Sequence, residues 1–168
     1  MTDTIDEARF RGIFAHLGAV TAYAKRRGSR DPDGVAAEVM TIAWRRLAVV
    51  PNDDPLPWLY ATARNVVYAE ARSRRRTAPE GIAGTSPSPQ LNSLDPELDA
   101  ALRALRTSDR EALLLVAWED LSPSQAAETL GITPTAFRVR LFRARRRLRA
   151  ALLEQQPTPI AHLDVEGT

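Results

Sequence analysis

Two helix starts separated by a glycine turn constrain the fold of the last third of this chain of 168 residues. At Ser122-Pro123 a capping side chain precedes a proline in the first helical position, and Gln125 follows at capping-box spacing. The same cap-then-proline signal recurs at Thr133-Pro134. Gly131, between them, can supply the left-handed residue that commonly ends a helix. The pattern predicts a short helix, a tight turn and a longer helix, which together form a helix-turn-helix.

The spacing of small and apolar residues supports this motif. Ala127 is small enough for two helices to cross closely, and Phe137 can fill the angle between them. At about 100° per residue, one face of the second helix is apolar and consists of Phe137, Leu141, Ala144, Leu148 and Leu152. The opposite face carries Thr135, Arg138, Val139, Phe142, Arg143 and Arg146.

Arginines mixed with outward apolar groups are unusual on a solvated helix face. They suit the major groove of DNA, where arginines contact phosphates or guanine edges and apolar groups contact thymine methyls. A basic helix on a plain helical hairpin is the alternative. The caps, the glycine turn and the basic outer face together favour DNA binding.

Charge is distributed unevenly along the chain. The formal net charge is only +2, yet the sequence pI is about 9.5. Arginines cluster at residues 72–76 and again at residues 138–149, and neither cluster contains an acidic residue. Two such clusters in a small protein favour a polyanionic partner.

Membrane insertion and catalysis have little support in the sequence. There is no cysteine, no apolar run of membrane-spanning length and no signal-peptide pattern, so we expect a cytoplasmic protein without a membrane partner.

His16 and His162 are not spaced like the ligands of a metal site. Asp31, Asp33 and Glu38 could form a metal cluster, but acidic residues ordinarily complement a helix N-terminus. We therefore expect no enzymatic activity, no cofactor and no metal.

Apolar residues at helical spacing predict an all-α fold. In the N-terminal part we expect helices at about 6–28, 32–48 and 56–75. Aromatic residues in these and later helices are expected in the core or at junctions, namely Trp44, Trp58 and Trp118.

The middle of the chain loses this periodicity. Residues 77–95 are rich in proline, glycine and serine and predict a flexible linker. Helix resumes at Pro96, and the spacing of Ser108 and Glu111 predicts the cap of the next helix. Residues 154–168 have no clear pattern, and we expect a disordered tail.

Asn65 lies in the middle of the helix predicted at 56–75, although asparagine is a mediocre helix former. It either faces solvent, which helical spacing alone favours, or belongs to a pocket that reads an unstacked base. The acidic, proline-rich loop before it and the arginine cluster after it fit the second interpretation.

In this order the motifs resemble those of bacterial RNA polymerase sigma factors of the extracytoplasmic-function group. The resemblance covers about residues 10–153. Asp31–Arg45 is similar to the second-region helix of that family, and Leu121–Arg147 is similar to its fourth-region helix-turn-helix. The most specific match is Pro57–Asn65, which is similar to the promoter-melting segment.

The resemblance implies two small helical domains joined by the linker. Residues 6–76 would form a region 2-like helical bundle that binds core RNA polymerase and recognises and melts the −10 element. Residues 96–153 would form a region 4-like helix-turn-helix domain that recognises the −35 element. The implied partners are promoter DNA, the clamp helices of the largest polymerase subunit and the polymerase flap. Most members of the family also have an anti-sigma factor.

The resemblance also implies roles for individual residues. The −35 element would be read by Thr135, Arg138, Val139, Phe142, Arg143 and Arg146. At the −10 element, Asn65 would hold a flipped base together with the loop of Asn52, Asp53 and Asp54. Phosphates would be held by Arg64, Arg72, Arg74 and Arg75. Polymerase contacts would come from Asp31, Asp33 and Glu38.

The sequence departs from the family where its second-region helix usually carries an acid and a glutamine. Gly34 and Ala37 occupy these places, and only Glu38 remains. A second hypothesis is therefore a two-domain DNA-binding regulator that does not engage polymerase. A third, a nucleic-acid enzyme subunit targeted by the helix-turn-helix, is disfavoured because no catalytic constellation is found. Asp120 stands where the family often has glycine.

Overall fold

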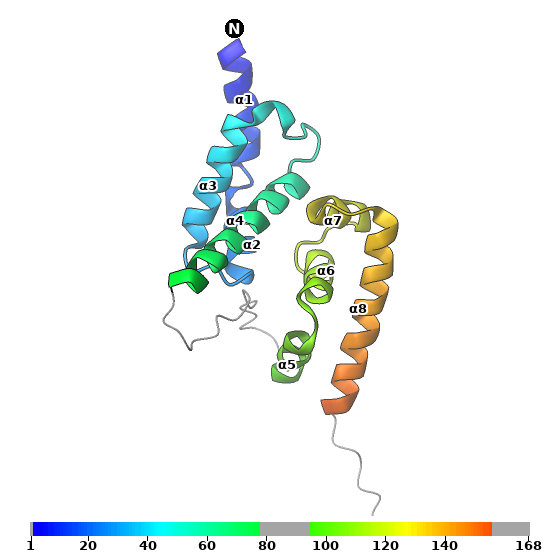
Figure 1. The fold of residues 1–168 in the computed structure, drawn as a ribbon. Coiled ribbons are helices and arrows are strands. Elements are labelled where there is room, and N and C mark those ends of the chain that lie inside the picture. Colours follow the sequence, from blue (N-terminus) through cyan, green and yellow to red (C-terminus); the bar gives the residue numbers. More distant parts are fainter. Residues whose placement is uncertain (1, 78–94, 156–168) are drawn as a thin grey trace, which may run out of the picture.

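The computed structural model describes residues 2–77 and 95–155, which form an all-helical fold (Figure 1). The N-terminal half contains α1 (Thr2–Phe14), α2 (Leu17–Arg26), α3 (Pro32–Arg45) and α4 (Leu56–Thr77). The C-terminal half contains α5 (Pro96–Ala104), α6 (Thr107–Ala117), α7 (Pro123–Leu130) and α8 (Pro134–Gln155). The predicted linker, apart from its end residues, and most of the predicted tail lie outside the described residues.

The single helix predicted at 6–28 is wrong, because the chain turns at Ala15 and His16 and forms α1 and α2 instead. The turn lets α2 pack against both α3 and α4, with Val20 and Tyr23 fully buried. A continuous helix would keep the apolar residues of α1 and α2 on one face. In the structure Phe14 is instead 47% exposed.

The second predicted helix also ends earlier than expected. α3 stops at Arg45, and the 3-10 turn η1 (Leu47–Val49) follows it. Pro51 explains why helical backbone does not continue beyond η1, because the residue before a proline is biased toward extended backbone, as Val50 is with φ −71° and ψ 126°.

The predicted helix-turn-helix is confirmed in detail. Ser122 and Gln125 form a complete capping box at the start of α7, and Gly131 ends that helix with φ +64°. The Thr133 hydroxyl accepts a hydrogen bond of 3.1 Å from the Ala136 amide at the start of α8. Phe137, like Ala127, is almost completely buried where the two helices cross.

The cap predicted at Ser108 is wrong. α6 begins at Thr107, and its N-cap residue Arg106 makes no side-chain cap hydrogen bond. Glu111 is not a capping partner either, because its carboxylate is buried in an ion pair with Arg64.

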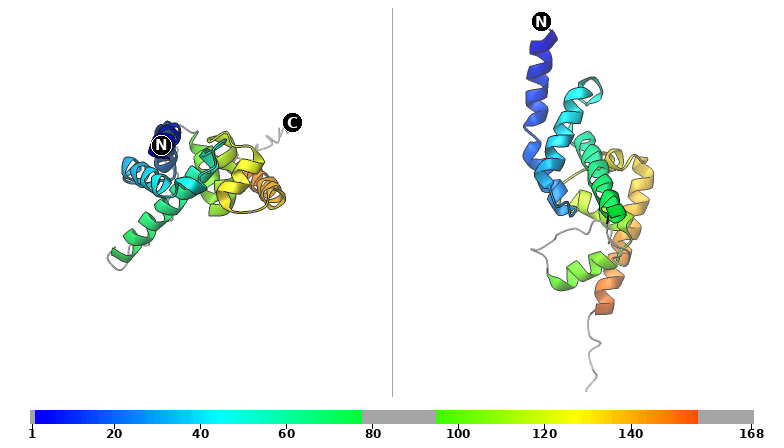
Figure 2. Two further views of the ribbon diagram at one scale, coloured as in Figure 1. Left: turned by 90° about the horizontal axis from the view of Figure 1, so that it is seen from above. Right: turned by 60° about the vertical axis from the view of Figure 1, so that its left-hand side comes forward.

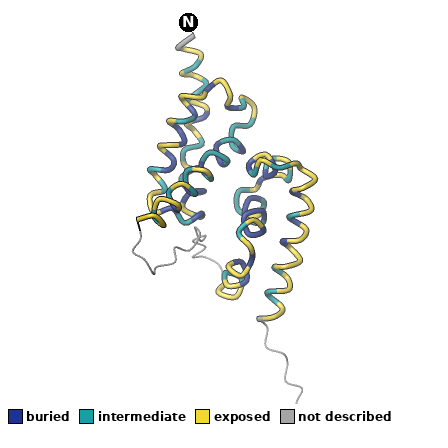
Figure 3. The backbone as a smooth tube through the Cα atoms, in the orientation of Figure 1, coloured by how far each residue is buried: buried dark blue, intermediate teal, exposed yellow. Residues whose placement is uncertain are grey.

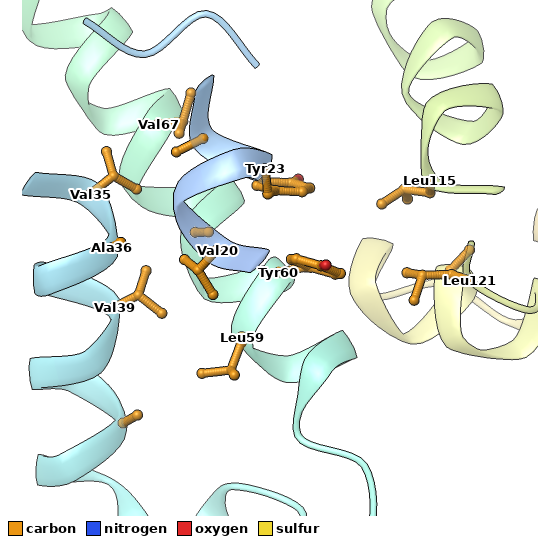
Figure 4. Packing of buried hydrophobic residues seen from close by; sticks show 14 of the residues in the cluster. Val20, Tyr23, Val35, Ala36, Val39, Leu59, Tyr60, Val67, Leu115 and Leu121 are labelled. Atoms are coloured by element: carbon orange, nitrogen blue, oxygen red, sulfur yellow. The ribbon is translucent and has the colours of Figure 1, made fainter. Parts of the chain in front are cut away.

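The two halves pack against each other and share a hydrophobic core. Tyr23 and Tyr60 stack with ring centroids 4.8 Å apart, and Leu115 and Leu121 lie opposite them on the C-terminal half (Figure 4). Dark blue buried segments face each other across this junction in Figure 3. α8 lies on the side of the C-terminal half that faces away from α1 and α3 (Figures 1 and 2).

Candidate nucleic-acid interface

The outer side of α8 presents an exposed mixture of basic and apolar groups, which we call the reading face. All six residues predicted to read the −35 element are exposed there: Thr135, Arg138, Val139, Phe142, Arg143 and Arg146. Val139 is 45% exposed and Phe142 is 62% exposed, while Phe137, Leu141 and Ala144 bury the opposite side. Solvent exposure of large apolar groups beside arginines indicates a surface that a partner covers.

A groove between the start of α6 and the first turns of α8 adjoins this face. It is lined by the reading-face residues Thr135, Val139 and Arg143, and also by Arg106 and Arg140. Sequence reasoning did not single out Arg106 or Arg140 as candidate readers, because neither lies on the outward stripe of α8. An ion pair between Arg147 and the buried Asp109 anchors α8 to α6 beside the groove.

α4 carries a second basic surface. Asn65, Ala69, Arg72 and Arg76 follow one another at helical spacing and are all exposed, and we call them the α4 stripe. The structure therefore places Asn65 and Arg72 on one solvent-facing side. Arg76 joins them, although it was left out of the predicted phosphate contacts. The arginine cluster at residues 72–76, to which Arg76 belongs, was the sequence signal that could have identified it.

Two predicted phosphate contacts are engaged within the protein instead. Arg64 donates two hydrogen bonds to Glu111 on α6, and its guanidinium lies 4.9 Å from the ring of Tyr68. Arg74 is ion-paired to Glu70 at 3.0 Å, and this glutamate also accepts a hydrogen bond from Ser29. In this arrangement both guanidinium groups are held within the protein and are only partly exposed.

The predicted base-binding loop is only partly free. Asn52 and Asp53 are exposed, but Asp54 accepts a hydrogen bond of 2.6 Å from Gln125 on α7. Asn65 lies nine residues into α4 from Leu56, which is roughly 13 Å along a helix. The structure thus does not bring the loop and Asn65 together around one base.

Ionisation at the junction follows burial and pairing. The hydrogen bond with Glu111 raises the pKa of Arg64, although burial opposes the shift. Burial raises the pKa of Tyr60 to about 12, and the negative charge of Glu119 adds to this. Tyr60 therefore stays neutral and Arg64 stays charged at neutral pH.

The acidic residues predicted to face polymerase are exposed but separate. The Asp31 carboxylate accepts a hydrogen bond of 2.9 Å from the Gly34 amide and caps α3. A Cβ atom at Gly34 would lie 2.1 Å from that carboxylate, so glycine here makes room for the cap. Glu38 lies further along α3 at an exposed position, and Asp33 belongs to the first turn.

An aromatic patch covers the outer side of α1 and α3. Trp44 was expected in the core, but it is 48% exposed and packs edge-on against Phe10, with ring centroids 5.0 Å apart. Phe14 completes the patch 6.0 Å from Phe10. Sequence reasoning missed it, because Trp44 has the same helical spacing as truly buried residues. Trp58 and Trp118 are half-buried.

Comparison with known proteins identifies the family. The Sigma-70 region 4 family matches residues 96–148. The ECF RNA polymerase sigma factor SigL of Mycobacterium tuberculosis is 30% identical to this chain, over 89% of the chain and 92% of SigL. The chain belongs to the ECF sigma factor family. As a sigma factor it acts in transcription initiation.

Other relatives agree with this assignment. The probable RNA polymerase sigma factor RfaY of Xanthomonas campestris pv. campestris is 34% identical over 90% of this sigma factor, which spans 42% of the length of RfaY. The sigma factor RpoE, solved with the anti-sigma factor NepR from Bartonella quintana, is 25% identical with a TM-score of 0.62. That match covers 87% of this chain and 97% of RpoE.

A second solved relative supports the same fold. CnrH, in complex with the cytosolic domain of CnrY, is 26% identical with a TM-score of 0.61. The match covers 88% of this sigma factor and 89% of CnrH. The all-helical, two-domain fold predicted from the sequence is thereby confirmed. Within residues 2–77 and 95–155, no helix is long and apolar enough to cross a membrane.

Proposed function

We propose that this sigma factor binds core RNA polymerase and recognises the −35 element with the reading face of α8. The observation that carries the proposal is the exposure of Val139 and Phe142 among exposed arginines on a capped recognition helix. Arginines on this face can contact guanine edges and phosphates, and the apolar pair can contact thymine methyls. Arg106 and Arg140 extend the basic surface along the adjoining groove.

The α4 stripe is proposed to engage the −10 element. Asn65 is exposed and can offer an amide to the edge of an extruded base. Arg72 and Arg76 lie on the same side, where they can hold the phosphates of the opened strand. Arg64 would join them only after it leaves Glu111, so full engagement requires the two halves to separate.

The outer side of α3 is the proposed polymerase-binding surface. Glu38 supplies a charge there, and the aromatic patch of Phe10, Phe14 and Trp44 supplies exposed apolar area. Asp31 is assigned to capping α3, which leaves Asp33 and Glu38 as the predicted acidic contacts. Aromatic contacts on this surface would therefore compensate for the acid and the glutamine that the family usually carries where this chain has Gly34 and Ala37.

We further propose that an anti-sigma factor regulates this protein in the cytoplasm. The support is that RpoE was solved in complex with the anti-sigma factor NepR. The chain would act by binding alone, with core polymerase supplying all chemistry.

Affinity capture of core RNA polymerase by the full-length chain tests the proposal. We expect a stoichiometric complex, and we expect Trp44→Ala to weaken it at least several-fold. Lys25→Ala, an exposed change on α2, is the matched control and should bind as the wild type does. Sequence-specific DNA binding without any capture of core enzyme would favour the alternative of a regulator that does not engage polymerase.

A further inference from the structure

A small cavity lies between the two halves, at a junction to which the proposed function assigns no ligand. Its lining includes Tyr23 of α2 and Arg27, the C-cap residue of that helix. α4 contributes Arg64 and Tyr68, and α6 contributes Thr107, Arg110 and Glu111. Its volume is about 30 Å³, more than the roughly 10–15 Å³ that a single water requires. The cavity therefore has room for more than a single water molecule.

The charges around the cavity do not balance. Three arginines face one carboxylate, and both oxygens of Glu111 already accept hydrogen bonds from Arg64 at 2.5 and 3.1 Å. Arg110 is 8% exposed, and within the described residues its side chain makes one hydrogen bond, a long contact of 3.5 Å to the Arg103 carbonyl. Within the described residues, neither Arg27 nor Arg110 makes an ion pair, although the charges of Glu111 and Glu119 act on Arg27.

Arg27 is the clearest sign of a missing partner. Its side chain is 8% exposed and lies 4.7 Å from the ring centre of Tyr23. Within the described part of the chain, its Nε and Nη2 atoms have no hydrogen-bond acceptor, and the buried Tyr23 hydroxyl has no partner either. A buried cation without acceptors is costly, and an anion in the cavity would remove that cost.

The N-terminus of α6 adds a further set of donors. Thr107 is the first residue of this 11-residue helix and lines the cavity. The N-cap residue Arg106 makes no side-chain cap hydrogen bond. A helix N-terminus is a favourable place for an anion, because its first amides lack intrahelical acceptors and the helix dipole is positive there.

We propose that this cavity binds a small inorganic oxyanion such as phosphate, held by Arg27, Arg110 and the first amides of α6. The bound anion bridges α2 and α6, and it therefore stabilises the packed arrangement of the two halves. Anion binding to the cavity does not depend on the proposed function. The effect of the anion on promoter engagement does rest on the proposed function, because the bound anion would keep Arg64 paired with Glu111.

Calorimetric titration of the free full-length chain with sodium phosphate, at ionic strength held constant with chloride, tests the site. We expect saturable binding of one phosphate per chain, accompanied by a rise in Tm. Arg27→Gln and Arg110→Gln should each weaken binding at least tenfold. Arg46→Gln, an exposed change just after α3, is the matched control and should leave the affinity unchanged. Unaltered affinity in both cavity variants would overturn the proposal.

Amide NMR on the wild-type chain keeps the test decisive if a variant fails to fold. We expect phosphate to shift the amide signals of Thr107 and Ser108 at the concentration that saturates the calorimetric signal. Shifts confined to α8 would mean that phosphate binds the arginines of the reading face instead, and the cavity site would be excluded.

Adenosine monophosphate distinguishes a free anion from a nucleotide phosphate, and we expect it not to shift the amide signals of Thr107 and Ser108. Equal shifts with the nucleotide would contradict a site for a small inorganic anion.

Discussion

Arg64 donates to both carboxylate oxygens of Glu111, with an Nε–Oε1 distance of 2.5 Å, and thereby ties α4 to α6. Arg26 makes the same kind of paired contact with Glu119, at 3.0 Å for Nε–Oε1. The two glutamates are almost fully buried, with side chains 7% and 1% exposed, and the arginines are partly solvated. These pairs tie the two halves together and engage Arg64 within the protein.

Removing both carboxylates should loosen this arrangement. In Glu111→Gln combined with Glu119→Gln, each arginine loses a charged acceptor, which costs about 1–3 kcal/mol per buried charged hydrogen-bonding group. We expect a lower free energy of unfolding and a larger radius of gyration by small-angle X-ray scattering. Glu128→Gln, an exposed change on α7, is the control. A double variant as compact and as stable as the control would show that the shared apolar core alone holds the halves together.

Phe137 and Phe142 lie five residues apart on α8 with opposite environments. Phe137 is fully buried, so Phe137→Ala should lower the free energy of unfolding by about 3–5 kcal/mol. Phe142 is 62% exposed, so Phe142→Ala should change stability by no more than about 0.5 kcal/mol and instead weaken binding to −35 DNA. Chemical denaturation and fluorescence anisotropy measure the two effects. A large stability loss in Phe142→Ala would give this residue a packing role.

Arg138 is a candidate for a base contact on the reading face. Arg138→Ala should weaken −35 binding by about 1–3 kcal/mol and relax the preference at one base pair. Arg103→Ala, which removes an exposed arginine on α5, should leave the preference unchanged. Binding to a library of single-substitution promoters checks this. A uniform loss across all sequences would make Arg138 a phosphate contact instead.

Asn65 is predicted to act after duplex binding. Because its side chain is exposed on α4, Asn65→Ala should fold normally and bind duplex promoter normally in the holoenzyme. It should impair open-complex formation, since the amide no longer holds an extruded base. Permanganate reactivity of unpaired thymines measures opening. Equal losses in duplex binding and in opening would assign Asn65 a structural role.

Local signals in the sequence predicted the helix-turn-helix well. Ser122, Gly131 and Thr133 act within a few residues of their hydrogen-bond partners, so their roles can be read from spacing alone. Asp120 adds to this agreement, because its φ of +52° explains why glycine is favoured at that position.

Contacts between distant residues could not be predicted in the same way. Glu111 has the spacing of a capping residue, but its partner Arg64 lies 47 residues away. Glu119 and Arg26 are 93 residues apart. Trp44 shares its spacing with core residues, yet it is 48% exposed and packs edge-on against Phe10. Tertiary packing decides such cases, and helical periodicity does not report it.

The proposed engagement of the promoter requires the two halves of the chain to separate on polymerase. The chain has no cysteine, so Ser73→Cys on α4 and Ser124→Cys on α7 allow a donor and an acceptor dye to be attached at exposed positions. Single-molecule energy transfer should be high in the free chain and should fall when core polymerase and promoter DNA are bound. Unchanged transfer in a transcriptionally active complex would contradict the claim that Arg64 must leave Glu111.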